Sequence, residues 1–246
     1  MRASLPLFLM LLGLAPVQAV QVVLSPSQDT VIYDDAGGAL ANGSGDYLFT
    51  GQNGFNGGSR AMRSLLIFEL GGIPSDAVIN SVSLELTAVT PNPFGNREIN
   101  LHRLLGDWGE GASNADSGEA GGAASQTGDA TWIHRFFTTE SWTNPGGDFE
   151  ATESATQIVG QDGAYVWSSA GLVADVQGFV DGGLDNFGWI LIGEELQTAK
   201  RFHSGDGGDP GAPKLTIDYT PVPEPSVAVL MAGGLLLGAR RRLAQA

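Results

Sequence analysis

Met62-Arg63-Ser64-Leu65-Leu66-Ile67-Phe68-Glu69-Leu70 is the stretch that best indicates the fold of this chain. From Leu65 onward nearly every residue is apolar, as expected of a central strand that is covered on both faces. A break at Gly71-Gly72-Ile73-Pro74 separates this stretch from Val78 to Val89. Within that second run apolar and polar residues alternate, which is typical of a strand with one buried face. Both runs therefore predict β-strands.

Similar runs recur along the chain between clusters of turn residues. Further strands are expected at Thr30 to Tyr33, Tyr47 to Thr50, Ile99 to Leu104, Trp132 to Phe137, Phe187 to Ile192 and Pro213 to Tyr219. Gly171 to Val180 has apolar residues at helical spacing and predicts one short helix. Gly106 to Ala130 and Thr138 to Gly163 are rich in turn residues and predict long loops. Together these segments predict an all-β fold, a jelly-roll-like β-sandwich with one short helix.

The charge balance of the chain argues against one class of partner. Its 246 residues include 27 acidic and 12 basic side chains, which give a formal net charge of −15. Four of the basic residues, Arg2 and Arg240 to Arg242, lie close to the chain ends. Because phosphate binding needs a positive surface, no nucleic-acid partner is expected. The chain contains no cysteine, and a domain of this size can hold together without disulfides.

The N-terminal segment has the three parts of a secretory signal peptide. Arg2 supplies the positive charge, Leu5 to Leu14 form the apolar core, and Val17-Gln18-Ala19 fits a cleavage site between small residues. We therefore expect residues 1–19 to be a signal peptide and the mature chain to begin near Val20. A flanking segment of this kind takes no part in the fold.

The C-terminal segment, residues 221–246, combines a proline-rich motif, an apolar stretch and a basic cluster. Val222-Pro223-Glu224-Pro225 precedes the apolar stretch Val227 to Ala239, and Arg240-Arg241-Arg242 follows it. The stretch predicts a short hydrophobic helix, shorter than the roughly 20 residues that a spanning helix needs. Because arginine favours the cytoplasmic side of a membrane, everything before this helix is expected outside the cytoplasm.

This order of elements resembles the PEP-CTERM sorting signal of Gram-negative bacteria. The resemblance implies that the tail holds the protein transiently in the inner membrane, where an exosortase-type enzyme processes it. It also implies a final location at the cell surface or in the extracellular matrix. The alternative is a simple C-terminal membrane anchor, which would likewise place the protein outside the cytoplasm.

Short motifs in the same order as those of a known domain family occur along residues 20–220. They are Asp29-Thr30, Arg63, the turn Gly72 to Ala77, Asp107-Trp108-Gly109-Glu110, Thr131-Trp132, Trp142 to Phe149, Asn186 to Trp189 and Thr198 to Phe202. This set resembles the DNRLRE-type β-sandwich domains, which include the alginate-binding class of carbohydrate-binding modules. The string that gives the family its name is absent, and its usual late Arg-Glu pair is replaced around His203-Ser204-Gly205-Asp206. The resemblance implies carbohydrate binding without catalysis.

Two pairs of basic residues are candidates for binding an acidic polysaccharide. Arg60 lies close to Arg63, and Lys200 lies beside Arg201. If the two segments are neighbours in space, the four side chains form one basic patch, and arginine can bind carboxylates in a bidentate manner. Trp142 lies in a loop and is the tryptophan most expected to be exposed to a sugar. In the alternative, the arginines pair with acids of the chain and the tryptophans fill the core.

The sequence carries weaker indications of a metal and of catalysis. Asp29 and Asp218 lie near the first and last strands, where a jelly-roll domain can hold a structural calcium ion with oxygen ligands. Glu194 and Glu195 form the most evident pair of carboxylates. Because adjacent residues of a strand point to opposite faces, they could not flank one glycosidic bond. No other cofactor is expected.

These observations predict an exported, non-catalytic surface or extracellular-matrix protein that binds polysaccharide weakly, with an acidic polysaccharide expected. The first alternative is a purely structural component of a matrix or sheath, without a defined ligand. An enzyme that cleaves polysaccharides is the second alternative.

Overall fold

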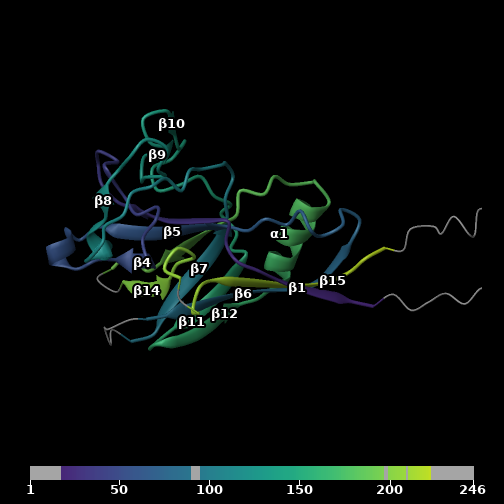
Figure 1. The fold of residues 1–246 in the computed structure, drawn as a ribbon. Coiled ribbons are helices and arrows are strands. Elements are labelled where there is room, and N and C mark those ends of the chain that lie inside the picture. Colours follow the sequence, from purple (N-terminus) through teal and green to yellow (C-terminus); the bar gives the residue numbers. More distant parts are fainter. Residues whose placement is uncertain (1–17, 90–94, 197–198, 209, 223–246) are drawn as a thin grey trace, which may run out of the picture.

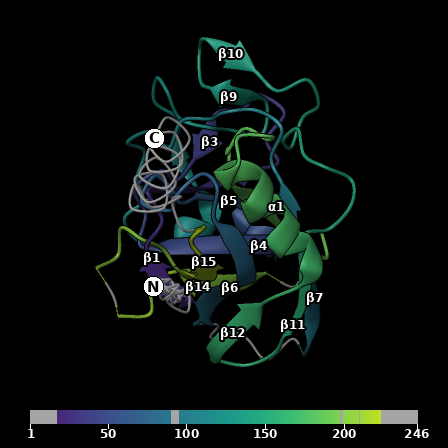
Figure 2. The ribbon, with the colours of Figure 1, turned by 90° about the vertical axis from the view of Figure 1, so that its right-hand side faces the viewer.

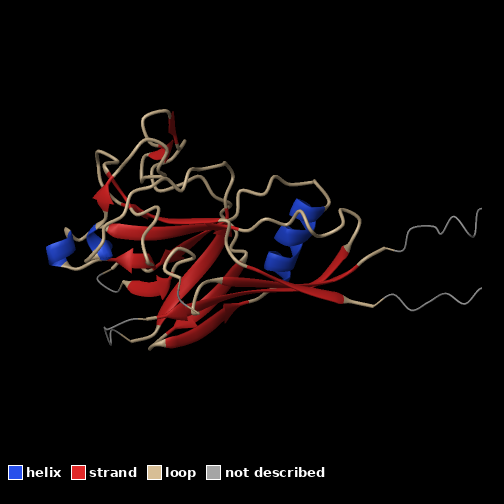
Figure 3. Cartoon of the chain, in the orientation of Figure 1, coloured by secondary structure: helices blue, strands red, loops and turns tan. Residues whose placement is uncertain are grey.

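The computed structural model describes residues 18–89, 95–196, 199–208 and 210–222 and confirms the predicted all-β sandwich (Figures 1 and 3). The strands are β1 (Val20–Leu24), β2 (Gln28–Tyr33), β3 (Leu40–Ala41), β4 (Tyr47–Gln52), β5 (Ala61–Ile67), β6 (Val78–Ala88), β7 (Arg97–Arg103), β8 (Ala123–Ala124), β9 (His134–Phe136), β10 (Glu140–Ser141), β11 (Ala155–Val159), β12 (Gly163–Trp167), β13 (Trp189–Gly193), β14 (Lys200–His203) and β15 (Lys214–Thr220). Among these residues there is one α-helix, α1 (Ala170–Val180), and there are two 3-10 turns, η1 (Phe55–Gly57) and η2 (Glu119–Gly121).

Two expectations about these elements are corrected. The segment from Thr138 to Gly163, predicted to be a long loop, contains strand β11. Every residue of β11 pairs with a residue of β7. The strand expected at Trp132 to Phe137 is shortened to β9. Trp132 itself is buried in an apolar cluster and hydrogen-bonds through its carbonyl to Gly146, so it does not continue the strand.

Thirteen of the strands form one continuous antiparallel sheet that folds into two layers, sheet A and sheet B, and β9 and β10 pair with each other in a small separate sheet. Sheet A contains β1, β15, β6, β12 and β14, and sheet B contains β8, β3, β2, β5, β13, β7 and β11. Strand β4 belongs to both, since its first residues pair with β14 and its last two pair with β5. The change of partner occurs at Gly51, whose φ of 99° lies in the left-handed region that glycine adopts without strain. One strand therefore joins the two layers.

The space between the sheets is filled by one apolar cluster. Sheet A contributes the inward face of β6, where Val82, Leu84 and Leu86 alternate with more exposed residues as the sequence predicts. Sheet B contributes Leu66 of β5 and Trp189 of β13. Fully buried aliphatic and aromatic side chains of this size each stabilise the fold by about 1.5–3 kcal/mol.

Helix α1 closes one end of this core (Figure 2). It begins after Ser169, whose hydroxyl accepts a hydrogen bond from the amide of Leu172 at 3.0 Å, as N-cap residues do. Leu172, Val176 and Val180 are buried at helical spacing, which confirms the predicted helix.

A second apolar cluster covers the other face of sheet B. Leu65 of β5 and Ile190 of β13 lie beneath Trp108, Trp132 and Trp142, which all come from the long segment between β7 and β11. Strand β5 is therefore covered on both faces, as its sequence predicts, because Leu65 and Leu66 point into different clusters. The loops of this segment lie above the sheets in Figure 3.

The two ends of the described domain lie side by side, because β1 pairs with β15 from Val20 opposite Tyr219 to Leu24 opposite Leu215 (Figure 1). The expected hydrophobic helix at Val227 to Ala239, the motif residues Pro223 to Pro225 and the triple arginine lie outside the described residues. In the part of the chain that is described, no helix has both the length and the apolar character needed to cross a bilayer.

Replacing Leu66 with alanine is expected to lower the free energy of unfolding by about 2–5 kcal/mol, because the cavity lies in a fully buried core. Leu196→Ala is the matched control, since that side chain is 63% exposed and its loss should cost about 0.5 kcal/mol or less. Urea denaturation of both variants measures the difference. Equal midpoints would contradict the placement of Leu66 between the sheets.

Candidate functional site

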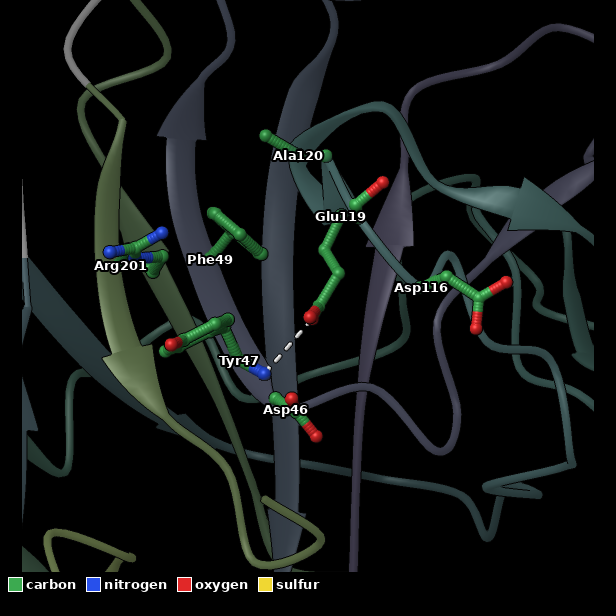
Figure 4. A pocket seen from close by; sticks show the side chains of 9 residues that line it. Asp46, Tyr47, Phe49, Asp116, Glu119, Ala120 and Arg201 are labelled. Carbon is green, nitrogen blue, oxygen red and sulfur yellow. Dashed lines mark hydrogen bonds between the residues drawn. The ribbon is translucent and has the colours of Figure 1, made fainter. Parts of the chain in front are cut away.

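A pocket lined by charged and apolar residues lies where β4 and β14 meet the segment around η2 (Figure 4). Its volume is about 220 Å³. The lining residues are Asp46, Tyr47, Phe49, Asp116, Ser117, Gly118, Glu119, Ala120 and Arg201. They come from three segments far apart in the sequence, and the pairing of β4 with β14 brings two of these together.

Tyr47 and Arg201 form one wall of the pocket. In the β4–β14 pairing Arg201 lies opposite Phe49, and it is therefore a diagonal neighbour of Tyr47 on the same face. The guanidinium carbon lies 4.3 Å from the centre of the Tyr47 ring, a cation–π contact. Nε of Arg201 donates a hydrogen bond of 2.8 Å to the carbonyl of Val89, which fixes the orientation of the side chain.

Glu119 forms the floor of the pocket and ties the loop to the sheet. Its carboxylate accepts hydrogen bonds from Asn42 Nδ2 at 2.9 Å and from the amide of Tyr47 at 3.0 Å (Figure 4). The hydroxyl of Tyr33 donates to the Glu119 carbonyl at 2.6 Å. Burial raises the pKa of Glu119, the hydrogen bonds from Asn42 and Tyr47 oppose this rise, and the charge of Asp46 adds to it.

Asp46 and Asp116 are exposed at the rim. Figure 4 shows Asp116 on the side of the pocket away from Arg201. Asp116 has a φ of 52°, a left-handed conformation that aspartate and asparagine adopt more readily than most residues. The described lining residues include three acidic residues and one arginine, so the pocket carries a negative formal charge overall.

The four predicted basic residues do not form one patch, and that expectation is wrong. Lys200 and Arg201 are adjacent on β14 and point to opposite faces. Lys200 is buried, and its ammonium donates to the carbonyls of Gly95 at 2.9 Å and Gly160 at 2.7 Å. Burial, together with the charge of Arg97, lowers the pKa of Lys200.

Arg60 and Arg63 are also bound within the chain. Arg60 donates to the carbonyl of Gly57 at 2.7 Å and lies 3.8 Å from the carboxylate of Asp35. The Arg63 guanidinium binds Glu195, its Nη2 lying 2.7 Å from Oε1. It also donates to the carbonyl of Gly146 and lies 4.6 Å from the centre of the Trp132 ring. For Arg63 the alternative, pairing with an acid of the chain, is therefore correct.

The expectation that Trp142 is exposed is wrong. Only 5% of its surface is accessible, and its indole N–H donates to the carbonyl of Thr131 at 2.9 Å. The other tryptophans, Trp108, Trp132, Trp167 and Trp189, are buried as well. Their large apolar rings cover sheet B or fill the core.

Asp29 and Asp218 do not share a site, which corrects the expected pair of calcium ligands. Asp218 lies on the outer face of β15 and accepts hydrogen bonds from Ser81 at 2.7 Å and Gln21 at 2.9 Å. Asp29 lies on β2, in sheet B. Strand β2 is near the start of the domain and β15 is at its end, but the two strands belong to different sheets. Asp29 and Asp218 are therefore not brought together.

Asp29 instead lies in an acidic cluster with Glu110 and Asp206, in which one carboxylate oxygen of each residue lies within 4.8 Å of the others. Asp29 accepts a hydrogen bond from the amide of Gly205 at 2.6 Å, and its own amide donates to Glu110 at 2.7 Å. Burial raises the pKa of Asp29 to about 7, and the charges of Asp206 and Glu110 add to the rise. Acidic groups of this kind are common without a cation, so the cluster alone assigns no metal, and calcium binding stays a prediction.

Sequence reasoning missed Glu119, Asp46, Asp116 and Glu110. Glu119 opens the 3-10 turn η2 and the other three lie in loops, and no local periodicity distinguishes a carboxylate that lines a pocket from a solvated one. The sequence matches no protein-family model and no curated protein.

Arg63→Ala is expected to lower the free energy of unfolding by about 1–3 kcal/mol, because it removes a partly buried ion pair and leaves the carbonyl of Gly146 without its donor. Lys214→Ala is the control, since its pair with Glu85 is exposed and worth about 0–1 kcal/mol. Chemical denaturation compares the two variants. A loss for Arg63→Ala no larger than for Lys214→Ala would contradict a structural role for Arg63.

Asp29 is expected to make stability depend on pH. Because its pKa rises from 3.8 to about 7 on folding, the folded protein keeps a proton that the unfolded chain has released. The free energy of unfolding should therefore fall as the pH rises from about 4 to about 7, and Asp29→Asn should lack this contribution. Asparagine can still accept the hydrogen bond from Gly205.

Thermal melts of both proteins in chelator across this pH range measure the effect. The melting temperature of the wild type should fall relative to that of Asp29→Asn as the pH rises. Parallel curves would contradict the raised pKa. Repeating the series in calcium tests the expected cation, which should raise the melting temperature of the wild type.

Proposed function

We propose that this protein is an exported, non-catalytic β-sandwich of a bacterial cell surface or extracellular matrix and that it binds polysaccharide. Export rests on the signal-peptide pattern of residues 1–19 and on the PEP-CTERM-like tail of residues 221–246. In this proposal an exosortase-type enzyme processes the tail after transient anchoring in the inner membrane. The pairing of β1 with β15 is consistent with this proposal, because it places Val20 opposite Tyr219, so the first and last strands of the domain begin and end at the same edge.

The observation that carries the binding proposal is the pocket between β4, β14 and η2. It combines an aromatic ring with a guanidinium at 4.3 Å and adds three carboxylates within about 220 Å³. A sugar presents many hydroxyl groups, which can accept hydrogen bonds from arginine and donate them to carboxylates. Arg201, one of the four basic residues predicted to bind polysaccharide, lines this pocket.

Two features support a protein without catalysis. Glycosidases use two carboxyl groups that flank the scissile bond. In the pocket, the Glu119 carboxylate is already held by Asn42 and by the amide of Tyr47. Glu194 and Glu195 are engaged in separate ion pairs, with Arg97 and Arg63 respectively.

A purely structural matrix component is the alternative, and one observation favours it. Arg60, Arg63 and Lys200 each hold a partner within the chain instead of facing a ligand. Arg201 also has partners within the chain, the carbonyl of Val89 and the ring of Tyr47, but it differs from the other three because it lines the pocket. Arg201 at the pocket is the residue that separates the two proposals.

Arg201→Ala is expected to weaken polysaccharide binding at least tenfold, about 1.4 kcal/mol, because it removes the guanidinium from the pocket wall. The assay is affinity electrophoresis of the purified protein in gels that contain different polysaccharides. Lys214→Ala is the matched control, since it removes one exposed positive charge elsewhere. Unchanged migration of Arg201→Ala in every polysaccharide that retards the wild type would contradict the pocket as the binding site.

A further inference from the structure

The charge of the pocket disfavours the acidic polysaccharide that the sequence suggests. A uronate entering it would meet one guanidinium, Arg201, and three carboxylates, those of Asp46, Asp116 and Glu119. A like charge within about 4–6 Å disfavours a second charged group. The predicted basic patch would have compensated for this repulsion, but Arg60, Arg63 and Lys200 are bound elsewhere.

The surroundings of the pocket increase this negative charge. The carbonyl of Asp46 accepts a hydrogen bond of 3.0 Å from the amide of Ser204, which places the loop around Asp206 beside the rim. Burial raises the pKa of Asp206 and of Glu119, and the charge of Asp46 adds to both rises, so Asp206 lies close enough to the pocket for its charge to act there.

The pocket is also polarised. Arg201 lies over Tyr47 on one side, and Asp116 lies on the other side, with Glu119 between them (Figure 4). A ligand that fits this arrangement accepts hydrogen bonds at one end and carries a positive charge at the other. Sugar hydroxyl and ring oxygens are acceptors for arginine, and an ammonium group on the same ring is a partner for carboxylates.

We propose that the pocket binds a polysaccharide of amino sugars whose amino groups are free and protonated. This inference rests on the proposed function and names its ligand class. The ammonium group contacts the exposed carboxylates of Asp46 and Asp116, and the sugar oxygens face Arg201. Binding of this kind weakens as salt is added, because both carboxylates lie at the exposed rim.

The experiment compares three short oligosaccharides by calorimetry with the purified protein near pH 6. They are an oligomer of glucosamine, the same oligomer fully N-acetylated, and an oligomer of galacturonate. N-acetylation replaces each ammonium group by a neutral and bulkier acetamide, so a preference for the first oligomer that weakens with added salt is the signature of its charge. We expect the glucosamine oligomer to bind at least tenfold more tightly than its N-acetylated form and the galacturonate oligomer to give no binding.

Asp46→Asn with Asp116→Asn tests the role of the rim. Asparagine keeps the size of each side chain and also tolerates the left-handed conformation at position 116. The double variant should bind the glucosamine oligomer at least tenfold more weakly, and its affinity for the N-acetylated oligomer should change less. Asp76→Asn with Asp185→Asn is the matched control, because it removes the same charge from two exposed positions that do not line the pocket.

The outcomes separate this inference from the proposed function. Tighter binding of the N-acetylated or galacturonate oligomer would overturn the amino-sugar inference and leave polysaccharide binding in place. An equal loss of affinity in the control variant would also overturn it, since the oligomer would then adsorb to the acidic surface in general. If none of the three oligomers binds the folded protein, and no polysaccharide retards it in gels, both proposals fail.

Discussion

A strand that is apolar on both faces has to be covered on both faces, and β5 imposes this constraint on the rest of the molecule. Its inward face packs against sheet A through Leu66, and its outward face presents Leu65. An apolar surface of this kind is unfavourable in water. The chain covers the outward face with the long segment between β7 and β11, which brings three tryptophans onto the sheet.

The candidate site follows from this covering segment. The same stretch of chain carries Glu119, whose buried carboxylate binds Asn42 and the amide of Tyr47 and so fixes the loop against β4. A buried carboxylate is costly unless it is hydrogen-bonded, and these contacts reduce the cost. The pocket beside them is thus a loop site on a rigid sheet, the arrangement in which binding residues are most often found.

The sequence predicted the fold better than it predicted the exposure and the partners of individual side chains. Arg63 has a guanidinium suited to a uronate, but the structure places it against Trp132 and Glu195, where it supports the covering segment. Trp142 lies in a polar stretch of sequence and is nevertheless buried. Arg201 alone among the four predicted basic residues lines the described pocket, because β14 places it on the face that Tyr47 shares.

The sequence by itself determined the fold class, the central strand β5, the alternating strand β6 and helix α1. Each of these depends on the spacing of apolar residues within a short stretch of the chain. The tertiary structure decided which side chains meet. Glu119 and Tyr47 are 72 residues apart, and Asp29 and Gly205 are 176 residues apart. Contacts over such separations depend on the order and register of strands in two sheets, which local periodicity does not specify.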